Sequence, residues 1–377
     1  MEIENYLNKM KEIQITLLRY IEDEANFEVN YNNLIKLFND GNISNIKFEF
    51  KSVLYLILNI SNNHHRGPDF FDKIFRIFAN FPDTITKYFS NYEIFNIFKS
   101  NNRILLYLIE EKLIVIDDSV ANAIKNSDNK TKFFFEEIKT FLDVKLNQKI
   151  SRTIPKNYEE LRKIGENDDT ICQLIRNDSV TEFDEYINKN NVDLNSTVKN
   201  SIFETNSLLI EKNTKLIEYA AFYGSMKIFN YFVSKNIDLS PSLWIYAIHS
   251  QNFELIHFLN EKKIYPHDFV FDKFLKESIK CHHFEITKYI QSNFYQNQNS
   301  CNIFTKSLKH FNFVYIQKDC INKYAFHDLC YYDYFMPVDI LLKTGKIDIN
   351  SKKILICFLY SILHWQFLNS ISNHSIQ

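Results

Sequence analysis

Apolar residues recur at helical spacing in three similar segments, residues 216–232, 243–259 and 274–290. In the first of them, Ala220 and Ala221 mark a close approach of two helices, and Gly224 follows where a helix can end. An apolar second helix comes next, so each segment predicts one helical hairpin. A hairpin of this length cannot bury its apolar face alone. We therefore expect an all-α fold in which the hairpins stack on one another.

Superposition of the segments aligns small residues with small ones and apolar residues with apolar ones. Gly224 aligns with Gln251 and His282, and an earlier hairpin at 171–187 has Asp178 at the same place. We call these four positions the hairpin-end positions. Where a side chain other than glycine adopts a left-handed backbone there, we expect about 1–2 kcal/mol of strain.

Residues 219–239, YAAFYGSMKIFNYFVSKNIDL, resemble the ankyrin core pattern of paired alanines, a helix-ending glycine, an aliphatic second helix and an Asp in the following loop. Together with IFETN at 202–206, they are similar to a large family of divergent ankyrin-repeat proteins from parasitic protists. Members of that family carry a helical region of unknown function ahead of the repeats. The resemblance covers about 168–292 and 326–350, and it implies an ankyrin-like helical-hairpin solenoid with a helical N-terminal region.

The chain departs from the ankyrin pattern at the Thr-Pro-Leu-His turn, which normally connects neighbouring repeats. Glu218 and Ile245 occupy the His position of the central copies, and only His327 keeps the histidine. We therefore expect irregular repeats of moderate stability.

The resemblance and the apolar pattern together predict four parts. Residues 1–150 form a helical N-terminal region, either separate or made of decayed repeats, and the polar residues 151–169 form a linker. Residues 170–350 hold the divergent repeats, with an insertion at 191–213 that forms a loop or a short helix. Residues 351–377 form an apolar tail. Its segment 354–368 is shorter than the roughly 20 residues of a membrane span, which favours a cap on the stack over a membrane tether.

Composition excludes several classes of function. The 377 residues carry a formal charge of -2, so no basic surface is expected for nucleic acid. The five glycines are too far apart for a phosphate-binding loop or a dinucleotide fingerprint. The six cysteines form no Cys-x-x-Cys pair, and the first residues lack the apolar core of a signal peptide. These features predict reduced thiols and a cytoplasmic or nuclear location.

Candidate chemistry is sparse in the sequence. Possible metal ligands are His64 with His65, Cys281 with His282 and His283, and His310 with Cys320, but none has the paired spacing of a zinc site. His327, Asp328 and Cys330 suggest a nucleophile, yet His327 falls at the ankyrin His position. The sequence therefore predicts no metal, no cofactor and no enzyme activity.

A binding face is the remaining expectation. In an ankyrin-like hairpin, the two residues after the paired small residues lie near the end of the inner helix, on the concave side. The partner-binding candidates at these positions are Tyr223, His249, Ser250, Lys280, Tyr331 and Tyr332. Tyr and His combine contact area with a polar tip, as recognition surfaces require. We expect a non-catalytic protein–protein interaction scaffold that binds an unidentified protein; the alternative is a membrane-associated ankyrin adaptor tethered by the tail.

Overall fold

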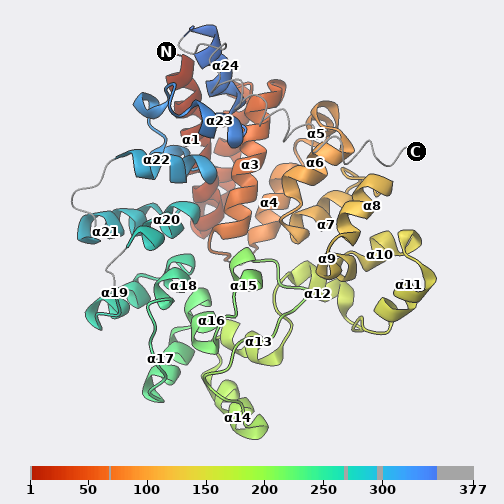
Figure 1. Cartoon of the computed structure of the whole chain (residues 1–377), viewed down its shortest axis with the longest axis vertical. Helices are drawn as coiled ribbons and strands as arrows, with labels where there is room; N and C mark the ends of the chain where they lie inside the picture. The colour runs from red at the N-terminus through yellow and green to blue at the C-terminus, as the bar shows by residue number, and fades with distance from the viewer. Residues whose placement is uncertain (1, 68, 267–270, 295–299, 346–377) are drawn as a thin grey trace. The chain divides into compact units, whose positions relative to one another are not determined.

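The computed structural model describes residues 2–67, 69–266, 271–294 and 300–345 (Figure 1). Regular secondary structure in these ranges consists of α-helices and short 3-10 helices. A bridge between Thr197 and Lys215 lies outside any strand. The all-α fold class is therefore confirmed. The predicted tail, 351–377, lies outside the described residues.

The chain separates into two compact units. The first unit comprises Met1–Asn59, Asp72–Tyr88 and the described part of Asn297–Gln377, and the second comprises Ile60–Phe71 and the described part of Phe89–Gln296. These units do not coincide with the predicted parts. The region 1–150 is divided between them, and the last predicted repeat belongs to the same unit as the N-terminal helix.

The first unit is organised by α1 (Glu2–Glu22), whose buried residues form the single apolar face that their helical spacing predicts. Packed against α1 are α2 (Phe27–Asp40), η4 (Phe313–Tyr315) and α24 (Phe335–Lys343). The other helices assigned wholly or partly to this unit are η1 (Glu24–Asn26), η2 (Ile43–Asn45), α3 (Lys47–Asn63), α4 (Phe70–Phe78), α5 (Pro82–Tyr88), α22 (Ser300–Lys309), η5 (Lys318–Cys320) and α23 (Phe326–Tyr331).

A buried amide pair joins the two ends of the first unit. Gln14 in α1 donates from Nε2 to Oδ1 of Asn312 at 2.9 Å and accepts the backbone N–H of Val314 at 3.2 Å. Gln14 and Asn312 are both fully buried, although 298 residues separate them in sequence. Burial of polar groups is tolerated because they are hydrogen-bonded to one another.

The second unit contains the predicted hairpins. The three repeated segments form α16 (Leu216–Tyr223) with α17 (Met226–Ser234), α18 (Leu243–His249) with α19 (Phe253–Glu261), and α20 (Asp272–Lys280) with α21 (Phe284–Phe294) (Figure 1). The earlier hairpin forms α13 (Thr170–Arg176) with α14 (Val180–Asn190). The first helices pack in chain order, α13 on α16, α16 on α18 and α18 on α20. The aligned small residues Ala220, Ala247 and Ser278 are all fully buried in this stack, as their size predicts.

Other helices complete the second unit. They are α6 (Asn91–Phe98), α7 (Asn102–Glu110), α8 (Asp118–Lys125), α9 (Asp128–Phe133), α10 (Phe135–Ile138), η3 (Lys139–Phe141), α11 (Val144–Ser151), α12 (Tyr158–Ile164) and α15 (Ser207–Glu211). The predicted insertion 191–213 contains α15, whose Leu208 and Leu209 are buried. The predicted linker 151–169 contains α12, and its Tyr158, Leu161 and Arg162 are also buried. That segment is part of the packed core, in contrast to the exposed connection that its polar composition indicated.

Neighbouring hairpins are joined by carboxylates at two of the positions that depart from the ankyrin pattern. Asp178 accepts the backbone N–H groups of Lys227 at 3.1 Å and Ile228 at 2.9 Å, at the start of α17. Glu218, at the ankyrin His position, accepts the N–H of Lys215 at 2.8 Å and the hydroxyl of Ser242 in the next repeat. These bonds connect repeats without a Thr-Pro-Leu-His turn.

All four hairpin-end positions have a left-handed backbone. The φ angles are 50° at Asp178, 66° at Gly224, 53° at Gln251 and 61° at His282. Only glycine adopts this conformation without a steric cost from Cβ. Gln251 and His282 therefore have the left-handed backbone that the alignment with Gly224 predicts, and with it the expected strain.

Replacement of Gly224 by Ala should lower the free energy of unfolding of the second unit by about 1–2 kcal/mol. The alanine would have to keep the left-handed backbone of Gly224, and its Cβ would lie 3.3 Å from Nδ2 of Asn252. The matched reverse change, Gln251→Gly, should be stabilising by at most about 1 kcal/mol. Urea denaturation followed by far-ultraviolet circular dichroism measures both, and an unchanged midpoint for Gly224→Ala would contradict a need for positive φ.

Candidate functional site

The six predicted partner-binding residues are divided between the two units. Tyr223, His249, Ser250 and Lys280 belong to the second unit, whereas Tyr331 and Tyr332 belong to the first. His249 and Ser250 are only 2% and 6% exposed, so neither presents a side chain to a partner in this structure. Their polar type indicated exposure, but each finds a hydrogen-bond partner inside the stack.

His249 is bound to the following repeat. Its Nε2 lies 2.6 Å from Oε1 of Glu277, and Nζ of Lys280 donates to the same oxygen at 2.9 Å. Burial lowers the pKa of His249, which favours the neutral imidazole near pH 7. Burial alone would raise the pKa of Glu277, but the hydrogen bond with His249 and the charge of Lys280 lower it. The carboxylate is therefore ionised and its charge is compensated by Lys280.

Two further titratable residues are buried beside this pair. Cys281 is fully buried, and burial raises the pKa of its thiol well above the ordinary value. One ligand atom each of His249, Glu277 and Cys281 lie within 4.8 Å of one another. His283 is 1% exposed, and neither of its ring nitrogens has a hydrogen-bond partner among the described residues. We call His249, Glu277, Lys280 and Cys281 the His249 cluster.

The sequence contains a signal for this cluster in the spacing of Glu277 and Cys281 and in the alignment of the repeats. Glu277 precedes Cys281 by four residues, which places the two on one side of α20 and its end. His249 and Lys280 occupy aligned positions of successive repeats. Stacked repeats bring aligned positions together, so the pairing of His249 with Glu277 follows from the register of the repeats and not from spacing within one segment.

A second polar group surrounds Arg176 at the end of α13. Arg176 is paired through Nε with Glu166 at 2.7 Å and donates from Nη1 to the hydroxyl of Tyr219 at 2.7 Å. Burial raises the pKa of Tyr219 well above its ordinary value, so this hydroxyl remains protonated. A cavity of about 40 Å³ lies beside Tyr219 and Glu204. A volume of this size admits water but no metabolite-sized substrate.

The segment 202–206, on which the resemblance partly rests, is held in place by buried hydrogen bonds. Glu204 is buried, and its carboxylate accepts the backbone N–H groups of Thr205 at 2.9 Å, Asn206 at 2.8 Å and Asn167 at 3.3 Å. Burial raises the pKa of Glu204 despite these bonds. Arg66 donates to the Thr205 hydroxyl at 2.9 Å. The segment thereby ties residues around 66 and 167 to the hairpins.

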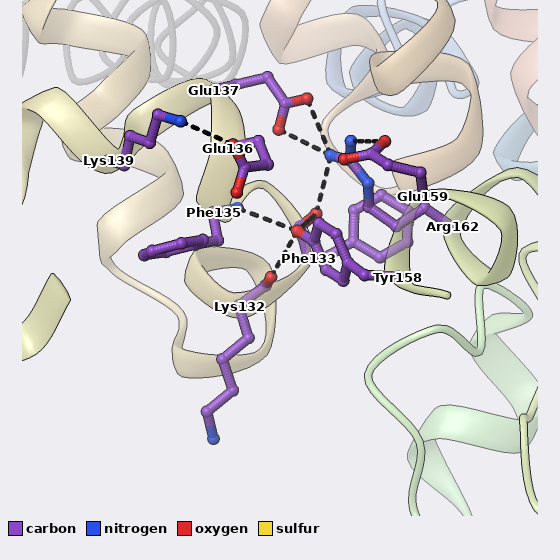
Figure 2. Close-up of polar contacts among 9 residues, drawn as sticks. All are labelled: Lys132, Phe133, Phe135, Glu136, Glu137, Lys139, Tyr158, Glu159 and Arg162. Atoms are coloured by element: carbon purple, nitrogen blue, oxygen red, sulfur yellow. Dashed lines mark hydrogen bonds and ion pairs between the residues drawn. The ribbon is translucent and has the colours of Figure 1, made fainter. Parts of the chain in front are cut away.

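A buried arginine organises the polar contacts between α9, α10 and α12 (Figure 2). Arg162 is 2% exposed and donates from Nη1 to both carboxylate oxygens of Glu137, at 2.8 and 2.7 Å, and to the carbonyl of Phe133 at 3.2 Å. Its guanidinium also lies over the ring of Tyr158, 4.6 Å from the centroid. Burial raises the pKa of Glu137 more than the arginine lowers it. Arg162 also donates to the exposed carboxylate of Glu159, so it joins α9, α10 and α12 through polar contacts.

The candidate nucleophile group His327, Asp328 and Cys330 lies on and beside helix α23. His327 is exposed, and its Nδ1 lies 3.3 Å from the carboxylate of its neighbour Asp328. Cys330 is partly buried. The arrangement places the His327 ring on the surface, stacked on the ring of Tyr331.

The most exposed tyrosines of the described residues lie on helix α23 and just ahead of it. Tyr324, just ahead of the helix, is 82% exposed, and Tyr331 is 61% exposed. The rings of His327 and Tyr331 stack with centroids 6.3 Å apart, and Tyr331 meets Tyr332 edge to face at 4.9 Å. We call Tyr324, His327 and Tyr331 the aromatic face. Tyr331 was predicted from the repeat alignment, whereas Tyr324 precedes the aligned positions and was missed.

No protein-family model, curated protein or solved structure matches this chain. The resemblance to divergent ankyrin-repeat proteins therefore stays a prediction. None of the described helices has the length and apolar content needed to cross a membrane.

Proposed function

We propose that this protein is a non-catalytic scaffold that binds another protein through a solenoid of ankyrin-like helical repeats and the helices around it. The ordered packing of the first helices of successive hairpins supports the repeat assignment. The catalytic motifs absent from the sequence support a binding role. Location in the cytosol or nucleus remains part of the proposal.

The aromatic face is the observation that carries this proposal. Tyr side chains combine apolar contact area with a polar hydroxyl, and they are enriched at the energetic centres of interfaces. Tyr324 and Tyr331 are both more than half exposed, and the ring of His327 stacks on Tyr331. The area of these rings is therefore accessible to a partner. We therefore move the expected binding surface from the buried His249 and Ser250 to this face.

Replacement of Tyr324, His327 and Tyr331 together by Ala should weaken partner binding at least about tenfold, because truncation of a single hot-spot residue costs about 2 kcal/mol or more. Proximity labelling in the native cell with the full chain would identify proteins enriched by the unchanged protein. Those that belong to the proposed partner should disappear with the triple variant.

A matched control changes other exposed apolar residues. Val115 and Val144 are 64% and 73% exposed and lie in the second unit. The variant Val115→Ser with Val144→Ser should retain the enriched proteins. Equal enrichment by the triple variant would reject the aromatic face, and no specific enrichment by the unchanged protein would reject the scaffold role.

A further inference from the structure

The His249 cluster unites three chemically different metal ligands from two successive hairpins. His249 ends α18, Glu277 lies in the last turns of α20, and Cys281 follows α20 directly. Their candidate ligand atoms all lie within 4.8 Å of one another. Around a tetrahedral zinc ion, ligand atoms lie about 3.2–3.6 Å apart, given bonds of about 2.0–2.3 Å. Small side-chain rotations would therefore bring these three groups to zinc-binding distances.

Buried nitrogen atoms without hydrogen-bond partners provide an independent observation. Nδ1 of His249 and both ring nitrogens of His283 have no partner among the described residues. The two imidazoles are 2% and 1% exposed, so bulk water does not satisfy them. Leaving a buried polar atom without a partner costs about 1–3 kcal/mol, and each such group in a folded protein needs an explanation. An ion bound beside His249 would give one for the imidazole of that residue.

We propose that His249, Glu277 and Cys281 bind a zinc ion that joins successive hairpins of the second unit. Thiolate, imidazole and carboxylate are the three ligand types that zinc takes from proteins. Harder ions such as Mg²⁺ or Ca²⁺ would not select a thiol. The fourth position around the ion is left for a water molecule.

Zinc binding would release one proton from the site. The Cys281 thiol releases its proton to solvent as its sulfur bonds to Zn²⁺, and His249 binds through one neutral ring nitrogen. Lys280, which now donates to Glu277, must turn away from the ion. Its side chain is 21% exposed, so its ammonium can reach solvent. Because His249 and Cys281 are buried, the ion would have a structural role and no access to a substrate.

The test uses the full chain, freed of metal with a chelator and then titrated with Zn²⁺ or Co²⁺. We expect about one zinc per chain after gel filtration, measured by mass spectrometry of the metal, together with a higher melting temperature. Cobalt should give the charge-transfer absorption of a metal–thiolate bond. This band tests the thiol ligand in the unchanged protein and needs no variant to fold.

Matched variants assign the ligands. Cys281→Ser and His249→Gln should bind zinc at least about tenfold more weakly, whereas Cys172→Ser, which alters another buried cysteine of the same unit, should bind normally. Lys280→Met should bind more tightly because a competing positive charge is removed. The proposal is overturned by cobalt binding without a thiolate band, by equal zinc binding to Cys281→Ser, or by the absence of stoichiometric zinc in the unchanged chain.

Discussion

Replacement of Arg162 by Ala should lower the free energy of unfolding of the second unit by about 3–5 kcal/mol, the usual cost of removing one partner from a buried ion pair. The change would leave the Glu137 carboxylate, only 15% exposed, without its counter-charge. It would also remove a donor from the carbonyl of Phe133 and the cation over the ring of Tyr158. Loss of packing at α12 should follow (Figure 2).

The chain has two units, so its unfolding cannot be assumed to be a single transition. Hydrogen exchange followed by mass spectrometry measures the loss of stability helix by helix. Protection should fall first in α9, α10 and α12. Glu159→Ala is the matched control, because Glu159 pairs with the same guanidinium but is 59% exposed. It should cost less than about 1 kcal/mol.

A double variant separates a buried charge from lost packing. Arg162→Met with Glu137→Leu removes both charges and keeps apolar volume, so it should be more stable than Arg162→Ala alone. If Arg162→Ala costs no more than Glu159→Ala, the guanidinium is not an anchor of this core.

The hairpins could be predicted because their information is local. Apolar spacing specifies the helices, small residues specify close helix contacts, and the hairpin-end positions specify left-handed backbone. The alignment of Gly224 with Gln251 was sufficient to locate a strained residue. The apolar spacing recurs in each hairpin because each one must bury its apolar face against its neighbours.

The division into units could not be predicted, because it depends on contacts between distant segments. Gln14 gives no sign in the sequence that its amide will meet Asn312. The segment 151–169 was interpreted as a linker from its polar residues, but Arg162 is polar and buried since Glu137 compensates its charge. The polar composition of a segment indicates that its side chains are costly to bury, but it does not indicate whether a partner of opposite charge lies nearby in the fold.

The candidate site shows the same limit. Exposure of Tyr331 followed from its position in the hairpin, but burial of His249 depended on a carboxylate one repeat later. The sequence-based expectation of no metal considered spacing within single segments. A ligand set divided between stacked repeats is invisible to that criterion, and it becomes apparent only when the register of the repeats is known.

Replacement of Glu204 by Ala should lower the free energy of unfolding by about 2–4 kcal/mol, because two backbone N–H groups, those of Asn167 and Asn206, lose the acceptor that the structure gives them. The N–H of Thr205 keeps an alternative acceptor, the carbonyl of Gly165 at 3.2 Å. Glu204→Gln should cost less, since its one oxygen can still accept from Asn206. Glu211→Ala, an exposed change nearby, should be within about 0.5 kcal/mol of the unchanged protein.

The pH dependence of stability distinguishes the charge of Glu204 from its hydrogen bonds. Burial raises the pKa of Glu204 in the folded state, so the folded chain binds this proton more tightly than the unfolded chain does. Stability should therefore fall as the pH rises from about 4.3, the ordinary glutamate value, through the raised folded value. Glu204→Gln does not titrate, and this part of the slope should disappear in urea denaturation across that range. An unchanged slope in Glu204→Gln would assign the titration to another carboxylate and leave Glu204 with a hydrogen-bonding role alone.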